Sequence, residues 1–314
     1  MTGAPGAEGR SAAAGKEFPA AAETWFRVAP VEPGVWLVGE PGHVNSWLIR
    51  GEERTILLDT GMGLADVSAA VATVCPEEPL VVNSHVHFDH VGGNELFAET
   101  AMHELGPEWI EAGCEPGQLR AYPDLIPAME AAYERLLAAD REGFFLIGPD
   151  EEMRPWPAAG IAAHGWRIEP PPPTRLLREG DELDLGGRVL RALHTPGHAP
   201  DHVCLLDERE GVLWAQDQAY YGPHLVYEPG ADLGDFVAST RRLAEELSGS
   251  LRAVYTAHCL RPTVPPAFLR ELADAAEAVA GDEATLTPAE GFFGEPVRSA
   301  DFGHFSIMIG DQQP

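Results

Sequence analysis

Four short segments near the start of the chain alternate hydrophobic with polar residues. They cover residues 25–28, 34–38, 44–49 and 55–58. Because alternation with a period of two is typical of strands that bury one face, we expect four strands in one antiparallel sheet. Residues 62–74 then have helical character, and the apolar run at 80–82 predicts a buried strand. Strands and helices therefore begin to alternate at this point.

Residues 105 to about 165 interrupt this alternation with helical material. The clearest part is 126–139, where apolar residues recur on one helical face. Four consecutive prolines at 170–173 end the segment with a stiff, extended spacer. We expect a helical insertion whose large side chains form a small core of their own. The alternative is that they form a lid or wall of a binding groove, and it concerns Trp109, Tyr122, Phe144, Phe145 and Trp156.

The second half of the chain again places strands before helices. Strand patterns occur at 182–192, 202–206, 211–215, 251–255 and 304–309, and helical patterns occur at about 233–247 and 266–279. Two strand groups followed by helices fit an α/β fold in which two sheets pack face to face with helices outside. This domain would span residues 23–314. Residues 1–22 lack periodicity and predict a disordered tail.

Composition narrows the class of partners. With 50 acidic and 21 basic residues, the net charge of −29 would repel nucleic acid phosphates, so we expect a small-molecule substrate and no nucleic acid partner. No stretch reaches the roughly 18 consecutive apolar residues of a membrane span, and no signal-peptide pattern is present, so we expect no membrane association. Cys75, Cys114, Cys204 and Cys259 show no CxxC spacing, which predicts a reduced, cytoplasmic protein.

Histidine and aspartate residues cluster directly after the predicted buried strand. Since residues two apart in an extended chain point the same way, His85 and His87 can converge on one metal ion. If a turn or a helix start follows, Asp89 and His90 swing to the other side of the same pocket. Three imidazoles and a carboxylate crowded at a strand end need a partner that holds them, which favours a metal site.

Three further candidate ligands occur later in the chain, and each of them follows an apolar run. His198 follows a Pro-Gly turn, Asp217 ends a predicted strand, and His258 repeats the arrangement of a strand followed by a ligand. Side chains at the same edge of two stacked sheets can meet in one groove, and Gly92-Gly93 permits close approach of the backbone there. Imidazole and carboxylate suit zinc, iron or manganese, so the ligand types leave the metal open.

These residues resemble the metallo-β-lactamase superfamily, whose HxHxDH motif, TPGH turn, bridging aspartate and final histidine occur here in the family's order over about residues 30–262. The resemblance implies a four-layer αββα sandwich of two mixed β-sheets flanked by helices. It also implies two divalent metal ions, zinc in the first place, with iron or manganese as alternatives. The implied ligands are His85, His87 and His198 for one ion and Asp89, His90 and His258 for the other, with Asp217 bridging and Asp59 supporting a ligand from behind.

Within the superfamily, the sequence is most similar to the quorum-quenching lactonases. Asp217 and Tyr220 match their Asp-x-x-Tyr motif, and the His-Phe-Asp-His core is shared. In those enzymes the tyrosine lies beside the substrate carbonyl, so the resemblance implies a catalytic role for Tyr220; the alternative is a tyrosine packed under the loop. This chain departs from the lactonase pattern because His90 and His198 are separated by 108 residues. This long separation leaves the identity of the substrate open.

Five other histidines have two interpretations each. His194 and His202 are either hydrogen-bonding partners of ligands or turn residues that point at solvent. His43, His224 and His304 either line the groove or are structural, and we expect the structural role.

The resemblance implies a metal-dependent hydrolase. A hydroxide that bridges two metal ions would attack a carboxylic ester, lactone or thioester of a small molecule, because coordination lowers the pKa of water to about 7. Asp89 is expected to accept or relay a proton after the attack. The sequence contains no Gly-x-Ser-x-Gly elbow and no P-loop pattern that would indicate another chemistry.

Two alternatives share the expected fold. A single-iron dioxygenase, similar to the persulfide dioxygenases, needs only part of the ligand set, so retention of Asp89, His90 and His258 favours two metals. A glyoxalase II-like thioesterase would recognise an anionic glutathione conjugate through basic residues late in the chain, and there are few of them here. A binding module without chemistry is the least favoured, because the ligand set is intact.

Overall fold

The computed structural model describes residues 18–143, 146–258 and 262–311. Most of the predicted tail, and also Phe144, Phe145 and Cys259, lie outside the described residues. The tail's last residues are described: Ala20 and Ala22 pack against the core, where helix α1 (Ala22–Trp25) begins. The three cysteines within the described residues are free and buried.

The first sheet has seven strands in sequence order. They are β1 (Arg27–Glu32), β2 (Val35–Glu40), β3 (Val44–Arg50), β4 (Thr55–Leu58), β5 (Leu80–Val82), β6 (Thr100–His103) and β7 (Arg175–Leu177). The first four strands pair antiparallel, as predicted, and β4 to β7 pair parallel. The sheet is therefore mixed. The sequence did not indicate β6 and β7, because both are short and lack an alternating pattern.

The second sheet has six strands in the order β14-β13-β11-β10-β9-β8. They are β8 (Glu182–Asp184), β9 (Val189–His194), β10 (Val203–Asp207), β11 (Val212–Gln216), β13 (Ala253–Thr256) and β14 (Thr263–Val264). The two sheets pack face to face, because residues from both form one buried cluster. Within it, the rings of Trp47 on β3 and Tyr255 on β13 stack with centroids 4.4 Å apart.

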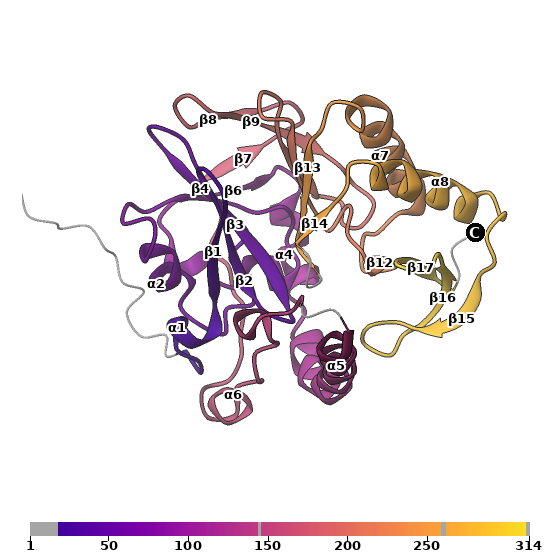
Figure 1. Cartoon of the computed structure of the whole chain (residues 1–314), viewed down its shortest axis with the longest axis horizontal. Helices are drawn as coiled ribbons and strands as arrows, with labels where there is room; N and C mark the ends of the chain where they lie inside the picture. The colour runs from indigo at the N-terminus through magenta and orange to yellow at the C-terminus, as the bar shows by residue number, and fades with distance from the viewer. Residues whose placement is uncertain (1–17, 144–145, 259–261, 312–314) are drawn as a thin grey trace, which may run out of the picture.

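Helices cover the outer face of each sheet (Figure 1). Apolar residues of α2 (Val67–Ala72) share a buried cluster with β2 to β5. Helices α7 (Leu233–Leu247) and α8 (Phe268–Ala280) share another with β10, β11 and β13. Burial of these apolar faces stabilises the four layers. The predicted αββα sandwich is confirmed.

A third, smaller sheet was not predicted. Its order is β12-β17-β16-β15, formed by β12 (Pro223–Val226), β15 (Thr287–Glu290), β16 (Pro296–Asp301) and β17 (Ser306–Gly310). Only the last strand had a clear sequence pattern. The sheet packs on α7 and α8, with Ile307 and Ile309 in the same cluster as Phe236 and Phe268. Long-range pairing between β12 and β17 therefore completes a layer that local patterns did not indicate.

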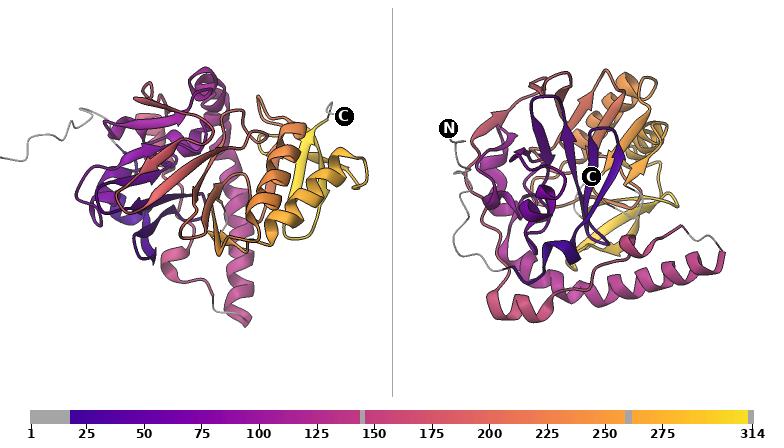
Figure 2. Two further views of the ribbon diagram at one scale, coloured as in Figure 1. Left: turned by 90° about the horizontal axis from the view of Figure 1, so that it is seen from above. Right: turned by 60° about the vertical axis from the view of Figure 1, so that its left-hand side comes forward.

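The segment predicted as an insertion contains α4 (Gly106–Gly113), α5 (Pro116–Gly143), the 3-10 turn Pro149–Glu151 and α6 (Ala158–His164). Figure 2 shows α5 running along one side of the molecule, with its C-terminal part projecting from the body. For Tyr122 and Trp156 the expectation of a separate small core was wrong, because Tyr122 belongs to the buried cluster beneath the first sheet and Trp156 packs against it. None of the helices in the described ranges is long and apolar enough to cross a membrane.

Candidate metal centre

The first four candidate ligands lie where the chain leaves β5 and enters a short helix. His85 follows the strand, and His87 is the N-cap of α3 (Phe88–Val91) with an extended backbone. Asp89 and His90 lie in the first turn of α3. The change from strand to helix swings the second pair of side chains around the pocket, as predicted from the motif.

The other three candidate ligands come from the second sheet. His198, Asp217 and His258 follow β9, β11 and β13. These strands run in the same direction, because β10 pairs antiparallel with both β9 and β11, and β11 pairs parallel with β13. Their carboxyl ends therefore lie at one edge of the sandwich, next to the end of β5.

Three imidazoles form one possible ligand group, made up of His85, His87 and His198. The Nδ1 atom of His87 lies 3.0 Å from His85 Nε2 and 3.0 Å from His198 Nε2. Burial, followed by repulsion from neighbouring histidines, holds the pKa values of His85 and His87 well below their ordinary range. The rings are therefore neutral, which is the form that binds a metal ion.

A second group consists of Asp89, His90 and His258. The Oδ2 atom of Asp89 lies 3.6 Å from His90 Nε2 and 3.5 Å from His258 Nε2. Burial alone would lower the pKa of His258, but the carboxylates of Asp217 and Asp89 raise it to about 9. The surplus of negative charge around these rings also suits a cation.

Asp217 lies between the two groups. Its Oδ2 atom is 3.4 Å from His198 Nε2 and 3.1 Å from His258 Nε2, and its Oδ1 atom is 3.4 Å from His90 Nε2. Burial would raise the pKa of this carboxyl, but His258 and His90 hold it well below its usual range. Asp217 is therefore an ionised carboxylate within reach of both groups, as the sequence resemblance implied.

Unpartnered atoms show that these residues fit a divalent metal. Within the described residues, His90 Nε2 and Asp217 Oδ1 are buried without a hydrogen-bond partner. Leaving such atoms unpaired in a protein interior is costly, and a coordinated cation would satisfy both. The set of imidazoles and carboxylates suits zinc, iron or manganese.

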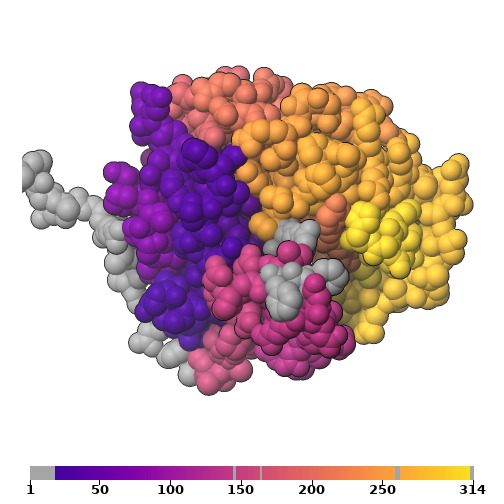
Figure 3. Space-filling view, viewed as in Figure 1, coloured from indigo at the N-terminus to yellow at the C-terminus, as the bar shows by residue number. Residues whose placement is uncertain are grey.

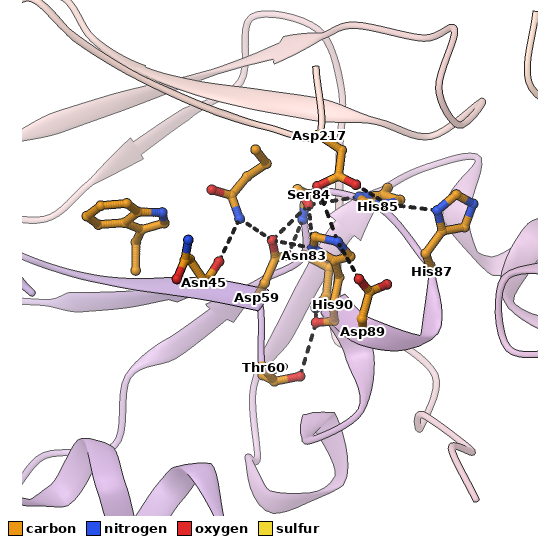
Figure 4. A network of polar contacts seen from close by, with 12 residues as sticks. Asn45, Asp59, Thr60, Asn83, Ser84, His85, His87, Asp89, His90 and Asp217 are labelled. Atoms are coloured by element: carbon orange, nitrogen blue, oxygen red, sulfur yellow. Dashed lines mark hydrogen bonds and ion pairs between the residues drawn. The ribbon is translucent and has the colours of Figure 1, made fainter. Parts of the chain in front are cut away.

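Asp59 holds the centre from behind, as predicted. Its carboxylate accepts hydrogen bonds from the backbone and hydroxyl of Ser84 at 2.7 and 2.9 Å, and from Gln216 Nε2 at 2.5 Å. Its Oδ2 atom also lies 2.9 Å from His90 Nδ1 (Figure 4). This contact fixes the ring so that Nε2 faces Asp217. Asp59 itself adopts a left-handed backbone with a φ of 64°, a conformation that is uncommon for residues other than glycine.

Backbone carbonyls orient two further ligands. His198 Nδ1 lies 2.9 Å from the carbonyl oxygen of Leu225, and His258 Nδ1 lies 3.1 Å from that of His43. Each Nδ1 atom donates to its carbonyl, which leaves Nε2 free to bind a metal ion. The surrounding fold thus determines which ring nitrogen of His198 and His258 faces the candidate metal centre.

Gly92 permits the close packing that the sequence predicted beside the centre. A Cβ atom at this position would lie 2.4 Å from the carbonyl carbon of Met62 and 2.6 Å from the carbonyl oxygen of Gly61. Any larger residue would push the loop after β4 away from α3. The loop carries Asp59 at its start, so this contact supports the position of His90.

The remaining histidines have mixed positions. His202 is fully buried, with its ring centroid 5.2 Å from that of His85 and its Nδ1 atom 2.8 Å from Thr195 Oγ1. His202 therefore packs beside a ligand rather than pointing at solvent. His194 stacks on the ring of His103, with centroids 3.9 Å apart. His43 lines the cavity described below, which is the role we did not favour.

His224 and His304 are not among the described residues that line this cavity. His224 is buried, and its ring stacks on that of Tyr220 with centroids 4.5 Å apart. His304 lies at the surface, where its Nε2 atom is 3.3 Å from a carboxylate oxygen of Glu271. Both therefore have the structural role that we expected from the sequence.

A cavity of about 210 Å³ opens beside the ligand cluster. His87, Asp89, His198, Asp217 and His258 all face it. In Figure 1 the hairpin between β15 and β16 points towards α5, and Figure 3 shows the surface hollowed between these segments. The walls are mostly apolar, formed by Met62, Phe88, Tyr122, Leu225, Phe292 and Phe293.

Tyr220 also lines this cavity. Its ring centroid lies 5.4 Å from that of His258, and its hydroxyl donates a hydrogen bond to the carbonyl oxygen of Pro223. The ring is therefore beside the candidate metal centre, while its hydroxyl bonds the backbone. Tyr220 therefore lies at the site, as a catalytic role requires. Its hydroxyl is bonded within its own loop, as the packing interpretation expects.

Sequence reasoning missed several cavity residues, namely Met62, Gln118, Glu228, Phe292 and Phe293. None belongs to a metal-binding motif, and they come from four separate segments of the chain. The sequence Gly291-Phe292-Phe293-Gly294 offered one signal, since glycines around two aromatic residues favour a turn. That signal indicates a turn but not its contact with α5.

Comparisons with known proteins match the chain to one family model and to named relatives. The family model described as Metallo-beta-lactamase superfamily matches residues 39–258. The chain is 32% identical to acyl-coenzyme A thioesterase MBLAC2 of Gallus gallus over 236 residues, which are 70% of this chain and 76% of that protein. It is 27% identical to the Homo sapiens protein of the same name over 238 residues, with the same coverage of each chain.

Solved structures share the fold. A metallo-beta-lactamase family protein from Thermus thermophilus is 25% identical, with a TM-score of 0.51 over 81% of this chain and 82% of that chain. The sec-alkylsulfatase Pisa1 from Pseudomonas sp. is 16% identical, with a TM-score of 0.59 over 81% of this chain and 42% of that chain, and this likeness concerns the fold alone. From the matched family model, the fold and the ligand cluster together, the chain belongs to the metallo-beta-lactamase superfamily.

Proposed function

We propose that the protein is a dinuclear metal-dependent thioesterase that hydrolyses thioesters of small acyl groups. The observation that carries the proposal is a pair of ligand groups that adjoin at Asp217 beside a largely apolar cavity. Similarity to two proteins named acyl-coenzyme A thioesterases supports thioesters as the first substrate class.

The ligand groups suggest a division of roles. His85, His87 and His198 would hold one ion, Asp89, His90 and His258 the other, and Asp217 would contact both. When bound, two zinc ions, or iron or manganese in their place, supply an activated water and a Lewis acid at neutral pH. Asp89 faces the cavity, so its carboxylate can take up a proton there and deliver it to the leaving sulfur.

The cavity walls would orient the acyl group and exclude water. Phe88 and Tyr122 contact edge to face with centroids 5.6 Å apart, and Phe292 lies 5.9 Å from Tyr122. An acyl chain packed among these rings would present its carbonyl towards Asp217 and His258. Orientation of this kind accelerates a reaction because the reacting groups lose little further freedom.

Lactones are a second candidate substrate class, favoured by the position of Tyr220 beside His258. In this arrangement the hydroxyl bonds the Pro223 carbonyl, so it would have to turn to reach a substrate oxygen. We expect Tyr220→Phe to lower lactone hydrolysis more than thioester hydrolysis if lactones are the true substrates. An equal effect on both classes would leave no reason to prefer lactones.

The decisive experiment combines metal analysis with a substrate screen. The protein is purified without added metal, its metal content per chain is measured by elemental analysis, and hydrolysis of acyl-coenzyme A, ester and lactone panels is followed. Two divalent ions per chain with thioester hydrolysis support the proposal. One iron per chain with oxygen consumption would overturn the proposal in favour of a dioxygenase. Bound metal without hydrolysis of any substrate would rule out the thioesterase function.

A further inference from the structure

The cavity has one polar wall that the metal centre does not use. Glu228 follows β12 and lines the cavity together with Gln118 from the start of α5. Only 8% of Glu228 is exposed. Its Oε2 atom accepts a hydrogen bond from Gln118 Nε2 at 2.9 Å, whereas Oε1 is buried without a hydrogen-bond partner within the described residues.

This carboxyl lacks a neutralising partner. The lining residues in the described part of the chain include no lysine or arginine, and the charged groups that act on Glu228 there are the carboxylates of Glu295 and Asp89. Burial, followed by repulsion from Glu295, raises the pKa of Glu228 to about 7. A buried carboxyl oxygen without a partner is costly, so a cavity that keeps one is suited to a ligand that supplies the partner.

The polar wall and the metal centre share one cavity. Asp89, at the metal end, is close enough to raise the pKa of Glu228 by charge repulsion. A cavity of about 210 Å³ suits a short acyl group that spans both ends. An acyl group with its carbonyl at the metal centre would therefore bring its substituents near Glu228.

We propose that Glu228 and Gln118 recognise a hydrogen-bond donor, a hydroxyl or amino group, carried on the acyl part of the substrate. This inference rests on the proposed thioesterase function. Glu228 Oε1 accepts the donor, and Gln118 holds the carboxyl in place through Oε2. Acyl groups without a donor leave Oε1 unpaired, so they bind less well.

The test compares matched thioesters on the metal-loaded protein. N-acetylcysteamine thioesters of butanoate and hexanoate are compared with their 3-hydroxybutanoyl, 3-aminobutanoyl, 6-hydroxyhexanoyl and 6-aminohexanoyl counterparts. At a pH above the pKa of Glu228, where its carboxyl is charged, we expect a preference in kcat/KM of about tenfold or more for at least one substrate with a donor over its plain partner, since a hydrogen bond to a charged group has roughly this effect. A ratio near one for every pair would overturn the inference.

Variants separate the hydrogen bond from the surrounding charge. Glu228→Leu should bring the ratio close to one, and Glu228→Gln should keep a preference for hydroxyl while losing one for amine. Glu295→Gln is the matched control, because Glu295 repels Glu228 but does not line the cavity. It should keep the preference, and a preference that survives Glu228→Leu would contradict the assignment.

Calorimetry distinguishes failure of the inference from failure of the proposed function. If the wild-type protein hydrolyses no thioester, the thioesterase proposal fails. Binding of 6-hydroxyhexanoate and 6-aminohexanoate, each against hexanoate, then still tests the polar wall. Tighter binding of an acid with a donor, lost in Glu228→Leu, supports donor recognition, and equal binding of all three acids refutes it.

Discussion

The metal-binding cluster and the cavity walls beside it are built in opposite ways. In the cluster, the ligands follow strands or lie in the first turn of α3, and the second ring nitrogens of His90, His198 and His258 contact fixed acceptors. The walls come from several elements, including α3, α5 and the hairpin between β15 and β16, and their aromatic residues contact one another through ring packing.

This difference separates chemistry from specificity. Directional hydrogen bonds define one geometry for each ligand, whereas apolar packing tolerates exchange of side chains of similar volume. The cluster should therefore fail sharply when one residue changes. The walls should change substrate preference while the metal stays bound.

Asp217→Ala should have the largest effect. Its carboxylate lies between the two ligand groups, so we expect loss of at least one metal ion and a fall in kcat/KM of roughly a thousandfold or more. Elemental analysis and thioester hydrolysis measure both. Asp124→Ala, an exposed position in α5, is the control and should match the wild type. A variant of Asp217 with full metal and full activity would contradict the assigned centre.

Asp59→Asn should weaken the cluster without removing a ligand. An amide cannot accept from all the donors that converge on Asp59, so the His90 ring would lose part of its support. We expect metal affinity to fall roughly 10- to 100-fold. Competition with a chelator of known affinity measures the change, and an unchanged affinity would show that His90 is held by other contacts.

Gly92→Ala should destabilise the fold beside the cluster. The new Cβ atom would lie 2.4 Å from a backbone atom of Met62, so the loop must shift, at a cost of roughly 1–3 kcal/mol. Urea denaturation measures the free energy of unfolding. Gly143→Ala is the matched control, because a Cβ there meets no atom within 4 Å among the described residues outside its own helix backbone and chain neighbours. Equal stability of the two variants would argue against the tight contact.

Phe292→Ala should have the smallest effect, confined to substrate binding. Loss of the ring removes apolar contact with the acyl group, so we expect KM to rise about 3- to 10-fold with the metal content unchanged. Steady-state kinetics with a series of acyl chain lengths measures this. Leu136→Ala, an exposed position on α5, should leave KM as it is. A loss of metal in Phe292→Ala would show that the walls and the cluster are not separable.

The insertion shows where prediction from sequence failed. The stripe at 126–139 correctly indicated a helix, and Ile126 is buried, but Leu136 on the same stripe is 47% exposed. Periodicity identifies an apolar face without identifying what covers it. Tyr122 and Trp156 pack in the core beneath the first sheet, and the local sequence pattern around neither residue predicted this contact.

The sequence by itself determined the candidate ligands and the central sandwich. Strand alternation and ligand spacing are local properties, so the apolar run at 80–82 and the spacing of His85 and His87 together predicted ligands at a strand end. Only the tertiary structure decided which segments form the cavity. Glu228, Gln118 and Phe292 meet through packing of elements far apart in the chain, and such contacts leave no periodic signal in any one of them.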